Sequence, residues 1–141
     1  MDQARRELCL LLPALVVTSA RRSEATNLPS KVYNFESLPL QASGQNAFRP
    51  IFGGKTHEGF RVALHETDLA PGAMPHPPHH HEYEEIFLIR EGLLQVTIGE
   101  RNSTLSPGSV AYVASNEEHG IRNVGNTHAQ YFVMELGTED A

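Results

Sequence analysis

The stretch HHHEYEEIFLIREG, residues 79–92, decides more about this chain than any other part of its sequence. Two of its histidines, His79 and His81, lie two residues apart, and Glu85 follows four residues after the second. In a β-strand, residues two apart point to the same side and lie roughly 6–7 Å from each other. Because imidazole and carboxylate groups are common ligands of transition metals, this spacing predicts a metal site.

Strand parity separates the three consecutive histidines into two groups. His79 and His81 face the same side and can ligate one ion, while His80 points away from it. A straight strand would carry Glu85 about 13 Å beyond His81. We therefore expect the chain to turn within residues 82–84, so that the carboxylate returns to the two imidazoles.

A second block supplies a further candidate ligand, His119, which lies four residues before Asn123 and after the turn Pro107-Gly108. We expect His119 in a loop that a closed barrel brings over the first block. Three imidazoles and one carboxylate suit one divalent ion of Fe, Mn, Ni, Cu or Zn, with two of six positions left for water, O2 or substrate. A solvated loop without metal explains an isolated His-x-His pair, but not both blocks together.

Short apolar stretches between turn residues predict an all-β protein. The candidate strands are Lys31–Phe35, Phe60–Leu69, Glu85–Arg90, Leu93–Ile98, Val110–Ala114 and Ala129–Leu136. Regular punctuation by Gly, Pro, Asn and Ser is typical of a β-sandwich or barrel. Residues 86–89 are apolar on both strand faces, which predicts a second covering layer from another sheet or a dimer partner.

The two blocks resemble the paired sequence motifs of the cupin superfamily. The first motif corresponds to Gly72…His79-x-His81-x3-Glu85-x6-Gly92, and the second to Pro107-Gly108…His119-x3-Asn123. With its flanking strands the resemblance covers residues 31–137 and is that of a small single-domain cupin with the type-2 conserved barrel. It implies a double-stranded β-helix, or jelly roll. It also implies four metal ligands: His79, His81, Glu85 and His119.

Two departures from the family pattern leave the subfamily open. Six residues separate Gly72 from His79 instead of the usual five, and Ser109 stands where an aspartate commonly follows the Pro-Gly turn. The resemblance implies a metal-dependent protein that acts on a small organic substrate, as a dioxygenase or related oxidoreductase, or as an isomerase or lyase. The alternative is a cupin that binds a small molecule or a sugar without turnover.

Other side chains near the blocks are candidates for the pocket. Phe87 shares the parity of Glu85 and is expected to line the barrel beyond the metal. His76 is a candidate contact for a ligand or substrate, and Asn123 is expected to brace the His119 loop by hydrogen bonding. One further histidine, at position 65, lies in a predicted strand from which it could face the interior. The remaining histidines are expected on the surface: His57, His80 and His128.

The first twenty residues differ from the rest of the chain. Arg5-Arg6 precedes an apolar run over residues 8–17, and small residues follow at 18–20, the order found in a secretory signal peptide. The paired arginines resemble a bacterial twin-arginine signal. Residues 1–20 are therefore expected to direct export to the periplasm or the exterior, with 21–30 as a linker. The alternative is a short packed helix in a cytoplasmic protein, since the run is shorter than the about 20 residues that span a bilayer.

Composition narrows the chemistry and the partners. The formal net charge is −6 and no long run of Lys or Arg occurs, so the sequence lacks the electrostatic footprint of a nucleic-acid-binding protein. Cys9 is the single cysteine of the sequence, which excludes an internal disulfide and a thiolate metal site. The expected partners are a small molecule and a second copy of this chain, in a homodimer.

Overall fold

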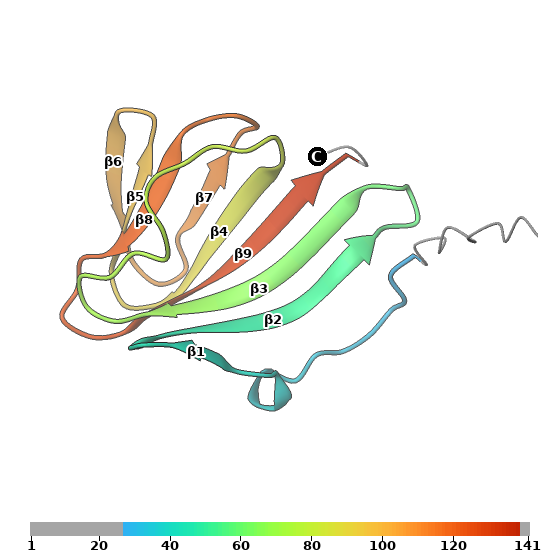
Figure 1. Cartoon of the computed structure of the whole chain (residues 1–141), viewed down its shortest axis with the longest axis horizontal. Coiled ribbons are helices and arrows are strands. Elements are labelled where there is room, and N and C mark those ends of the chain that lie inside the picture. The colour runs from blue at the N-terminus through green and yellow to red at the C-terminus, as the bar shows by residue number, and fades with distance from the viewer. Residues whose placement is uncertain (1–26, 139–141) are drawn as a thin grey trace, which may run out of the picture.

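The computed structural model describes residues 27–138, which are almost entirely β (Figure 1). The elements are the 3-10 helix η1 (Phe35–Ser37) and the strands β1 (Gln41–Ser43), β2 (Asn46–Lys55), β3 (Arg61–Leu69), β4 (Glu84–Glu91), β5 (Leu94–Ile98), β6 (Arg101–Leu105), β7 (Val110–Val113), β8 (His119–Asn123) and β9 (Ala129–Gly137). Within this part of the chain, no helix is long and apolar enough to cross a membrane. The predicted signal segment, 1–20, lies outside the described residues.

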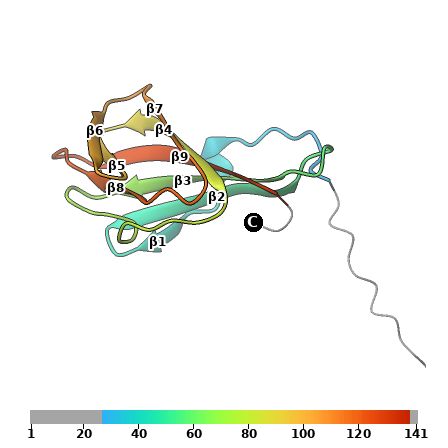
Figure 2. The ribbon, with the colours of Figure 1, turned by 90° about the horizontal axis from the view of Figure 1, so that it is seen from above.

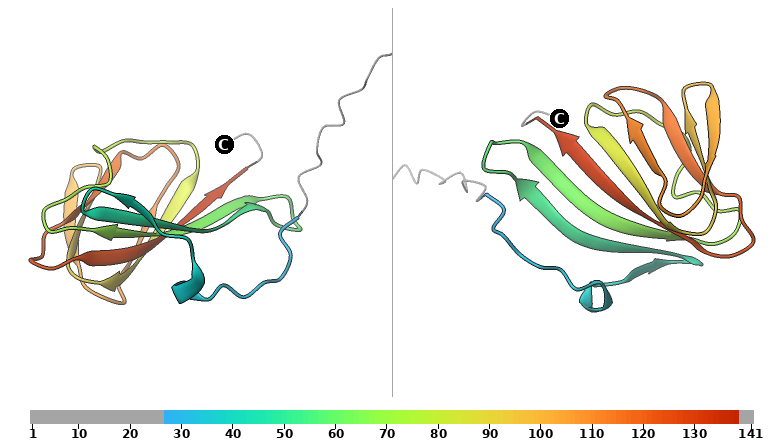
Figure 3. Two further views of the ribbon diagram at one scale, coloured as in Figure 1. Left: turned by 60° about the horizontal axis from the view of Figure 1, so that its bottom comes forward. Right: turned by 180° about the vertical axis from the view of Figure 1, so that it is seen from behind.

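Two sheets, both built from antiparallel pairs, face each other. The larger sheet has the strand order β1-β2-β3-β9-β4-β7, and the smaller has the order β6-β5-β8. Figure 3 shows the smaller sheet at one end of the larger, so strands far apart in the sequence surround a common interior. The predicted all-β, jelly-roll architecture is confirmed.

Alternation along the strands gives the large sheet an inner and an outer face. On the inner face the register aligns Phe87 of β4 with Val133 of β9, and Ile89 with Tyr131. These side chains are buried together with apolar residues of the smaller sheet: Leu94, Val96 and Ile121. The prediction that Phe87 points into the barrel is confirmed, because the strand parity inferred from the sequence is the one that the register has.

The segment before β1 is not the strand predicted at Lys31–Phe35. Asn34 instead caps η1, its side-chain oxygen accepting a hydrogen bond of 3.2 Å from the backbone N–H of Glu36. Phe35 then packs edge-on against Phe132 on the outer face of β9, with ring centroids 6.3 Å apart. Figure 2 shows this segment along one side of the sheet. The aromatic rings of Tyr33 and Phe35 pack against the sheet and the segment does not pair with it, which is why the strand prediction is wrong.

The described chain begins against the end of β2. Asn27 forms an isolated bridge with Lys55, and the backbone N–H of Leu28 donates to the Lys55 carbonyl at 2.8 Å. A side chain at Gly54 would collide with Leu28, since a Cβ there would lie 2.9 Å from Leu28 Cδ2. The last residues of the predicted linker therefore contact the barrel.

The outer face of β4 and β7 is apolar and exposed. Leu88 pairs with Val110, and Ile86 with Tyr112. The exposed fraction is 43% for Leu88, 57% for Val110 and 53% for Tyr112. Among the described residues no second sheet covers the outer face of residues 86–89, because η1 covers the outer face at β9 and leaves this part open; the other predicted cover, a dimer partner, stays a prediction.

Four strands of the structure were not predicted, β1, β2, β6 and β8, because their composition is atypical of strands. β2 contains Pro50, and its register with β3 shifts at an irregularity between Pro50 and Phe52. β6 is mostly polar and exposed, and β8 begins with His119 and Gly120. These strands form because each has an antiparallel neighbour: β2 for β1, β3 for β2, and β5 for both β6 and β8.

Gly92, the last residue of the first motif, lies in the turn from β4 to β5. Gly92 has φ 79°, a left-handed conformation that side chains disfavour. A Cβ at this position would also lie only 2.6 Å from Cβ of Ala129. The positive φ and the close approach of Ala129 both require glycine, so Gly92 is needed for the shape of the turn and has no chemical role at the site.

Candidate metal centre

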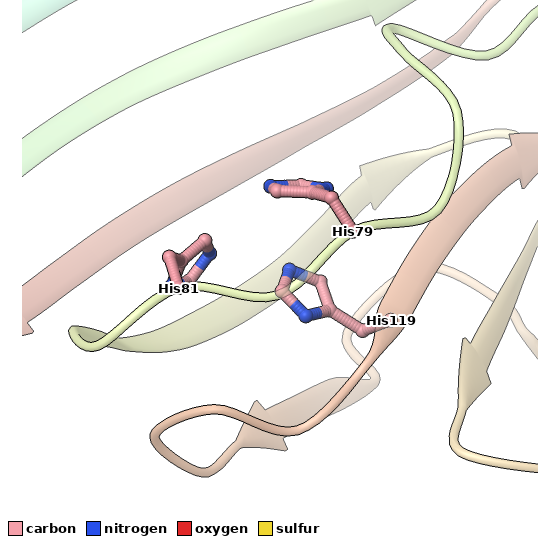
Figure 4. Close-up of side chains that lie close together, drawn as sticks. All are labelled: His79, His81 and His119. Carbon is pink, nitrogen blue, oxygen red and sulfur yellow. The ribbon is translucent and has the colours of Figure 1, made fainter.

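Three of the predicted ligands, His79, His81 and His119, lie in one cluster (Figure 4). Each offers one ring nitrogen, and these nitrogens all lie within 4.8 Å of one another. His79 and His81 belong to the loop before β4, whereas His119 begins β8. Backbone hydrogen bonds join the two segments: His79 N–H donates to the His119 carbonyl at 3.0 Å, and His119 N–H to the His79 carbonyl at 2.8 Å.

Backbone carbonyls fix the orientation of two of the rings. Nδ1 of His81 lies 2.8 Å from the Tyr83 carbonyl, and Nδ1 of His119 lies 2.8 Å from the Glu117 carbonyl. A carbonyl only accepts, so in both rings Nδ1 carries the hydrogen and donates it. The neutral form of each ring then has its lone pair on Nε2, the nitrogen that lies close to Glu85. A hydrogen bond from Nδ1 to a backbone carbonyl is typical of a histidine whose Nε2 ligates a metal.

Two ring nitrogens of the cluster are buried without a hydrogen-bond partner. They are Nδ1 of His79 and Nε2 of His81. Leaving a buried polar atom unsatisfied costs about 1–3 kcal/mol. A metal ion bound to such lone pairs removes that cost, so the donor set fits a transition metal. His80, between the two, is exposed, as strand parity predicts.

Glu85 enters the same cluster from β4 and is 7% exposed. Its Oε2 accepts a hydrogen bond from Nε2 of His119 at 3.1 Å, and its Oε1 lies 3.4 Å from Nε2 of His81. Burial raises the pKa of Glu85, but the bond from His119 and the nearby imidazole charges outweigh burial, so the pKa is lowered overall. Burial also works against a charged His119, yet its bonds to Glu85 and to the Glu117 carbonyl raise its pKa.

Both ring nitrogens of His119 thus lie against acceptor oxygens, an arrangement that favours a charged imidazole beside an ionised Glu85. A divalent ion would replace the Nε2 proton of His119 and would meet the same carboxylate. The turn that Glu85 requires is present, since the chain bends at residues 82–83 before β4 begins at Glu84. The expectation of a loop at His119 is wrong, because pairing with β5 continues to Ile98↔His119.

His76 is a further imidazole beside the cluster. Its ring is exposed and lies perpendicular to that of His79, with centroids 4.1 Å apart. Burial, followed by the charges of His76, His119 and His81, lowers the pKa of His79. A neutral His79 can offer a lone pair to a metal near pH 7, and His76 lines the same cavity beside it.

Asn123 does not brace the His119 segment, contrary to the prediction. It is fully buried and donates to the Leu69 carbonyl at 2.9 Å and to the Thr127 carbonyl at 2.8 Å, while its Oδ1 accepts from Gly125 N–H. Four residues of strand separate it from His119 by about 13 Å. Asn123 therefore ties the turn between β8 and β9 to the end of β3.

A cavity of about 350 Å³ extends from the cluster into the space between the sheets. This volume lies within the range of pockets that hold small organic molecules. His79, Glu85 and His119 are part of its wall, and so is Phe87, as predicted. Its apolar wall is completed by Leu69, Ile121, Tyr131 and Val133.

Two further polar residues of the wall, His65 and Glu135, face each other on the strands next to Glu85. Nδ1 of His65 lies 3.8 Å from Oε1 of Glu135. Burial lowers the pKa of His65, whereas burial and the charge of Glu85 raise the pKa of Glu135. The sequence allowed His65 to face the interior, but Glu135 was not identified as a site residue. Its signal was the alternation of β9, which places Glu135 and Val133 on one face.

Tyr83 was also missed by the sequence analysis. Its ring stacks on that of His81, with centroids 3.6 Å apart and planes at 7°, and it lines the cavity. Burial, followed by the nearby carboxylates of Glu135 and Glu85, raises the pKa of its hydroxyl. The available signal was its position two residues after a predicted ligand, inside the turn.

Comparison with known families and structures agrees with this geometry. A family model described as a cupin domain matches residues 65–135, which include all four predicted ligands. A search of curated proteins found no match.

Solved structures share the fold at low sequence identity. The cupin domain of Schizosaccharomyces pombe Cnp3 has a TM-score of 0.62 at 21% identity, over 77% of this chain and 74% of that one. A protein described as a predicted oxalate decarboxylase from Thermotoga maritima has a TM-score of 0.66 at 19% identity, over 76% and 99%. The polyketide cyclase RemF from Streptomyces resistomycificus has a TM-score of 0.63 at 18% identity, over 77% and 80%.

Proposed function

This chain belongs to the cupin family, and from that premise we propose that it binds one divalent transition metal through His79, His81, Glu85 and His119 and acts on a small organic molecule. One observation carries the proposal: three imidazoles have nitrogens within 4.8 Å of one another, and two of them, those of His79 and His119, line a cavity of about 350 Å³. Three histidines that leave a coordination position open are typical of catalytic sites, and a cavity beside them leaves room for a substrate.

The residues of the chain divide the work at such a centre. The carbonyls of Tyr83 and Glu117 hold the rings of His81 and His119 so that Nε2 of each faces Glu85. A bound metal would supply Lewis acidity and open coordination positions for substrate or O2. The apolar wall around Phe87 excludes bulk water from the reacting groups. The ligand set suits Fe, Mn, Ni, Cu or Zn.

The metal content of purified protein tests the proposal. We expect close to one transition-metal ion per chain in wild type and a sharp fall in His81→Ala, measured by elemental analysis after purification under reducing, metal-replete conditions. His80→Ala is the matched control, because His80 is adjacent in sequence but exposed, and it should retain the wild-type content. Wild-type protein without any metal would contradict the proposal.

Among reactions, we propose a dioxygenase or related oxidoreductase first, with an isomerase or lyase next. The family resemblance supports both, and the similar structures include a predicted oxalate decarboxylase and a polyketide cyclase. Oxygen uptake with catechols, thiols and β-diketones separates the cases. Uptake that requires metal supports a dioxygenase, and product formation without uptake supports an isomerase or lyase. Binding without either supports the alternative, a cupin that only holds a small molecule or a sugar.

We also propose a homodimer, formed through the outer face of β4 and β7. The support is the exposed apolar strip of Leu88, Val110 and Tyr112, which a soluble monomer rarely leaves in contact with water. Light scattering coupled to size exclusion should give twice the chain mass for wild type and a monomer for Leu88→Lys. A wild-type monomer at micromolar concentration would refute this assignment.

Export through residues 1–20 is a separate proposal, which rests on the order of Arg5-Arg6, an apolar run and small residues. N-terminal sequencing of protein from a native host tests it. A mature chain that starts near residue 21 supports export, and an intact Met1 on protein recovered from the cytoplasm contradicts it.

A further inference from the structure

The cavity holds a second polar group in addition to the histidine cluster, formed by His65 and Glu135. Nδ1 of His65 and Oε1 of Glu135 are 3.8 Å apart, too far for a hydrogen bond. Both residues line the cavity, and their side chains keep accessible fractions of 19% and 25%. Each can therefore form a hydrogen bond with a molecule that enters.

Neighbouring residues hold this pair in place. His65 lies in the middle of β3, aligned with Val133, and Glu135 lies one row further along β9. The ring of Phe48 packs against the His65 ring, with centroids 4.7 Å apart. Burial lowers the pKa of His65, so the neutral ring offers one donor and one acceptor nitrogen. Two rigid strands thus present a donor and acceptors to the cavity.

The pair and Glu85 lie on three neighbouring strands of the same inner face. Glu135 on β9 is aligned with Glu85 on β4, so it lies directly beside the proposed metal site, and His65 is on β3. The strand order β3-β9-β4 places β3 two strand spacings, roughly 10 Å, from β4. Phe87 and Val133 add apolar groups to the same wall. The pair therefore extends from the edge of the metal site to the far strand of the cavity.

The charges of the wall restrict what can bind. Among the described residues, the wall contains two glutamates, Glu85 and Glu135, and no lysine or arginine. Arg61 is close enough for its charge to lower the pKa of Glu135, but it is not part of the wall. A phosphate ester or a polycarboxylate would lack a cationic partner inside, other than the proposed metal, and would lie near negative groups.

We propose that His65 and Glu135 form a specificity subsite that hydrogen-bonds a neutral hydroxyl group of the substrate, beside the metal site. The inference rests on the proposed function, because another part of the substrate binds the metal. It names a substrate class: a small neutral compound with a metal-chelating oxygen pair and a hydroxyl group that reaches His65 and Glu135.

A matched pair of probes tests the subsite. The first is 5-hydroxy-2-(hydroxymethyl)pyran-4-one, and the second is its 2-methyl analogue, which has the same chelating oxygens but lacks the distal hydroxyl. Calorimetry with zinc-loaded wild type should show the hydroxymethyl probe bound about tenfold more tightly, which is the net contribution expected of one hydrogen bond to the hydroxyl. In His65→Leu and Glu135→Leu the ratio should fall to near one, while the methyl analogue keeps its affinity.

The controls separate this subsite from the metal proposal. Each variant is assayed for zinc first, and His57→Leu, at an exposed position, should keep both its zinc and the wild-type ratio. Should the leucine variants not fold, the ring nitrogens of His65 in wild type are followed by NMR and should shift with the hydroxymethyl probe alone. Wild type that binds zinc but prefers neither probe overturns the subsite and leaves the metal proposal intact. Wild type that binds no zinc overturns both.

Discussion

The large sheet buries one glutamate on each face, and the two are held by different partners. On the outer face Glu66 is fully buried and bonds Nη1 of Arg49 at 2.8 Å. The ring of Phe35 lies over that guanidinium, 4.8 Å from its carbon. On the inner face Glu85 meets the imidazoles of His81 and His119. Burial alone therefore does not distinguish a structural carboxylate from a candidate ligand.

The distinction lies in the chemistry of the partners. A guanidinium keeps its proton at every physiological pH and has no lone pair to offer, so Glu66 and Arg49 form a closed pair. Imidazoles lose a proton near neutral pH and then become ligands. The outer pair should therefore affect the free energy of unfolding, and the inner group should affect the affinity for metal. Each prediction below tests one side of this contrast.

The largest effect is expected when the outer pair is broken. Arg49→Ala leaves a fully buried carboxylate without its cation, which should lower the free energy of unfolding by about 3 kcal/mol. Urea denaturation measures the change. Arg101→Ala, at an exposed position of β6, should alter stability by no more than about 0.5 kcal/mol. Arg49→Met combined with Glu66→Leu should recover most of the loss, and a double variant as unstable as Arg49→Ala would argue against a charge effect.

Substitution of the inner glutamate should change metal affinity instead. Glu85→Gln keeps the size of the side chain but removes the charge, and we expect zinc affinity to fall at least tenfold, or about 1.4 kcal/mol. Competition with a chromophoric chelator measures the affinity. Glu82→Gln, on an exposed neighbour, should bind as wild type does. Equal affinity in Glu85→Gln would remove Glu85 from the proposed ligand set.

Phe35, which covers the pair of Arg49 and Glu66, should contribute less to the free energy of unfolding than the pair itself. Phe35 touches Phe132 and lies over the guanidinium groups of Arg49 and Arg90. Phe35→Ala should cost about 1–2 kcal/mol of unfolding free energy, because cation–π and edge contacts are lost while η1 stays half-exposed. Val32→Ala, in the same segment but 91% exposed, should be close to neutral. Equal stability of both variants would show that the segment does not cover the sheet.

The smallest expected effect is a divergence of histidine titrations within the inner cluster. Without metal, side-chain NMR should find the pKa of His119 above 6.5 and that of His79 below it. Because its pKa is raised, His119 contributes stability that is present below pH 6.5 and is lost as pH rises through the raised value. Metal should abolish both titrations. Identical titration of the two residues would contradict the described geometry.

The candidate site was largely accessible from the sequence because its members follow local rules. Parity alone paired His79 with His81 and turned His80 outward, and the distance to Glu85 required a bend, which the structure has at residues 82–83. The position of Glu135 was not accessible in this way. Its contact with His65 depends on the pairing of β3 with β9, and the two residues are far apart in the sequence.

The fold was predicted where strands are apolar and missed where pairing outweighs composition. β4, β5 and β9 carry the alternation that the sequence displays, whereas β2 includes Pro50 and β6 is mostly polar. The segment at 31–35 shows the opposite error: a strand was predicted there, but the rings of Tyr33 and Phe35 cover the sheet and the segment does not join it. The same residue types occur in segments that cover a sheet and in strands that pair within it, so only the tertiary structure distinguishes the two cases.

X-ray absorption of the zinc-loaded protein tests the central claim most directly, because it counts the imidazoles around the ion. The account predicts a first shell of nitrogen and oxygen with outer-shell scattering from three imidazoles in wild type, two in His119→Gln and three in His80→Gln. A wild-type spectrum that fits one imidazole or none, or one that is unchanged in His119→Gln, would contradict the claim that this histidine cluster is the metal centre.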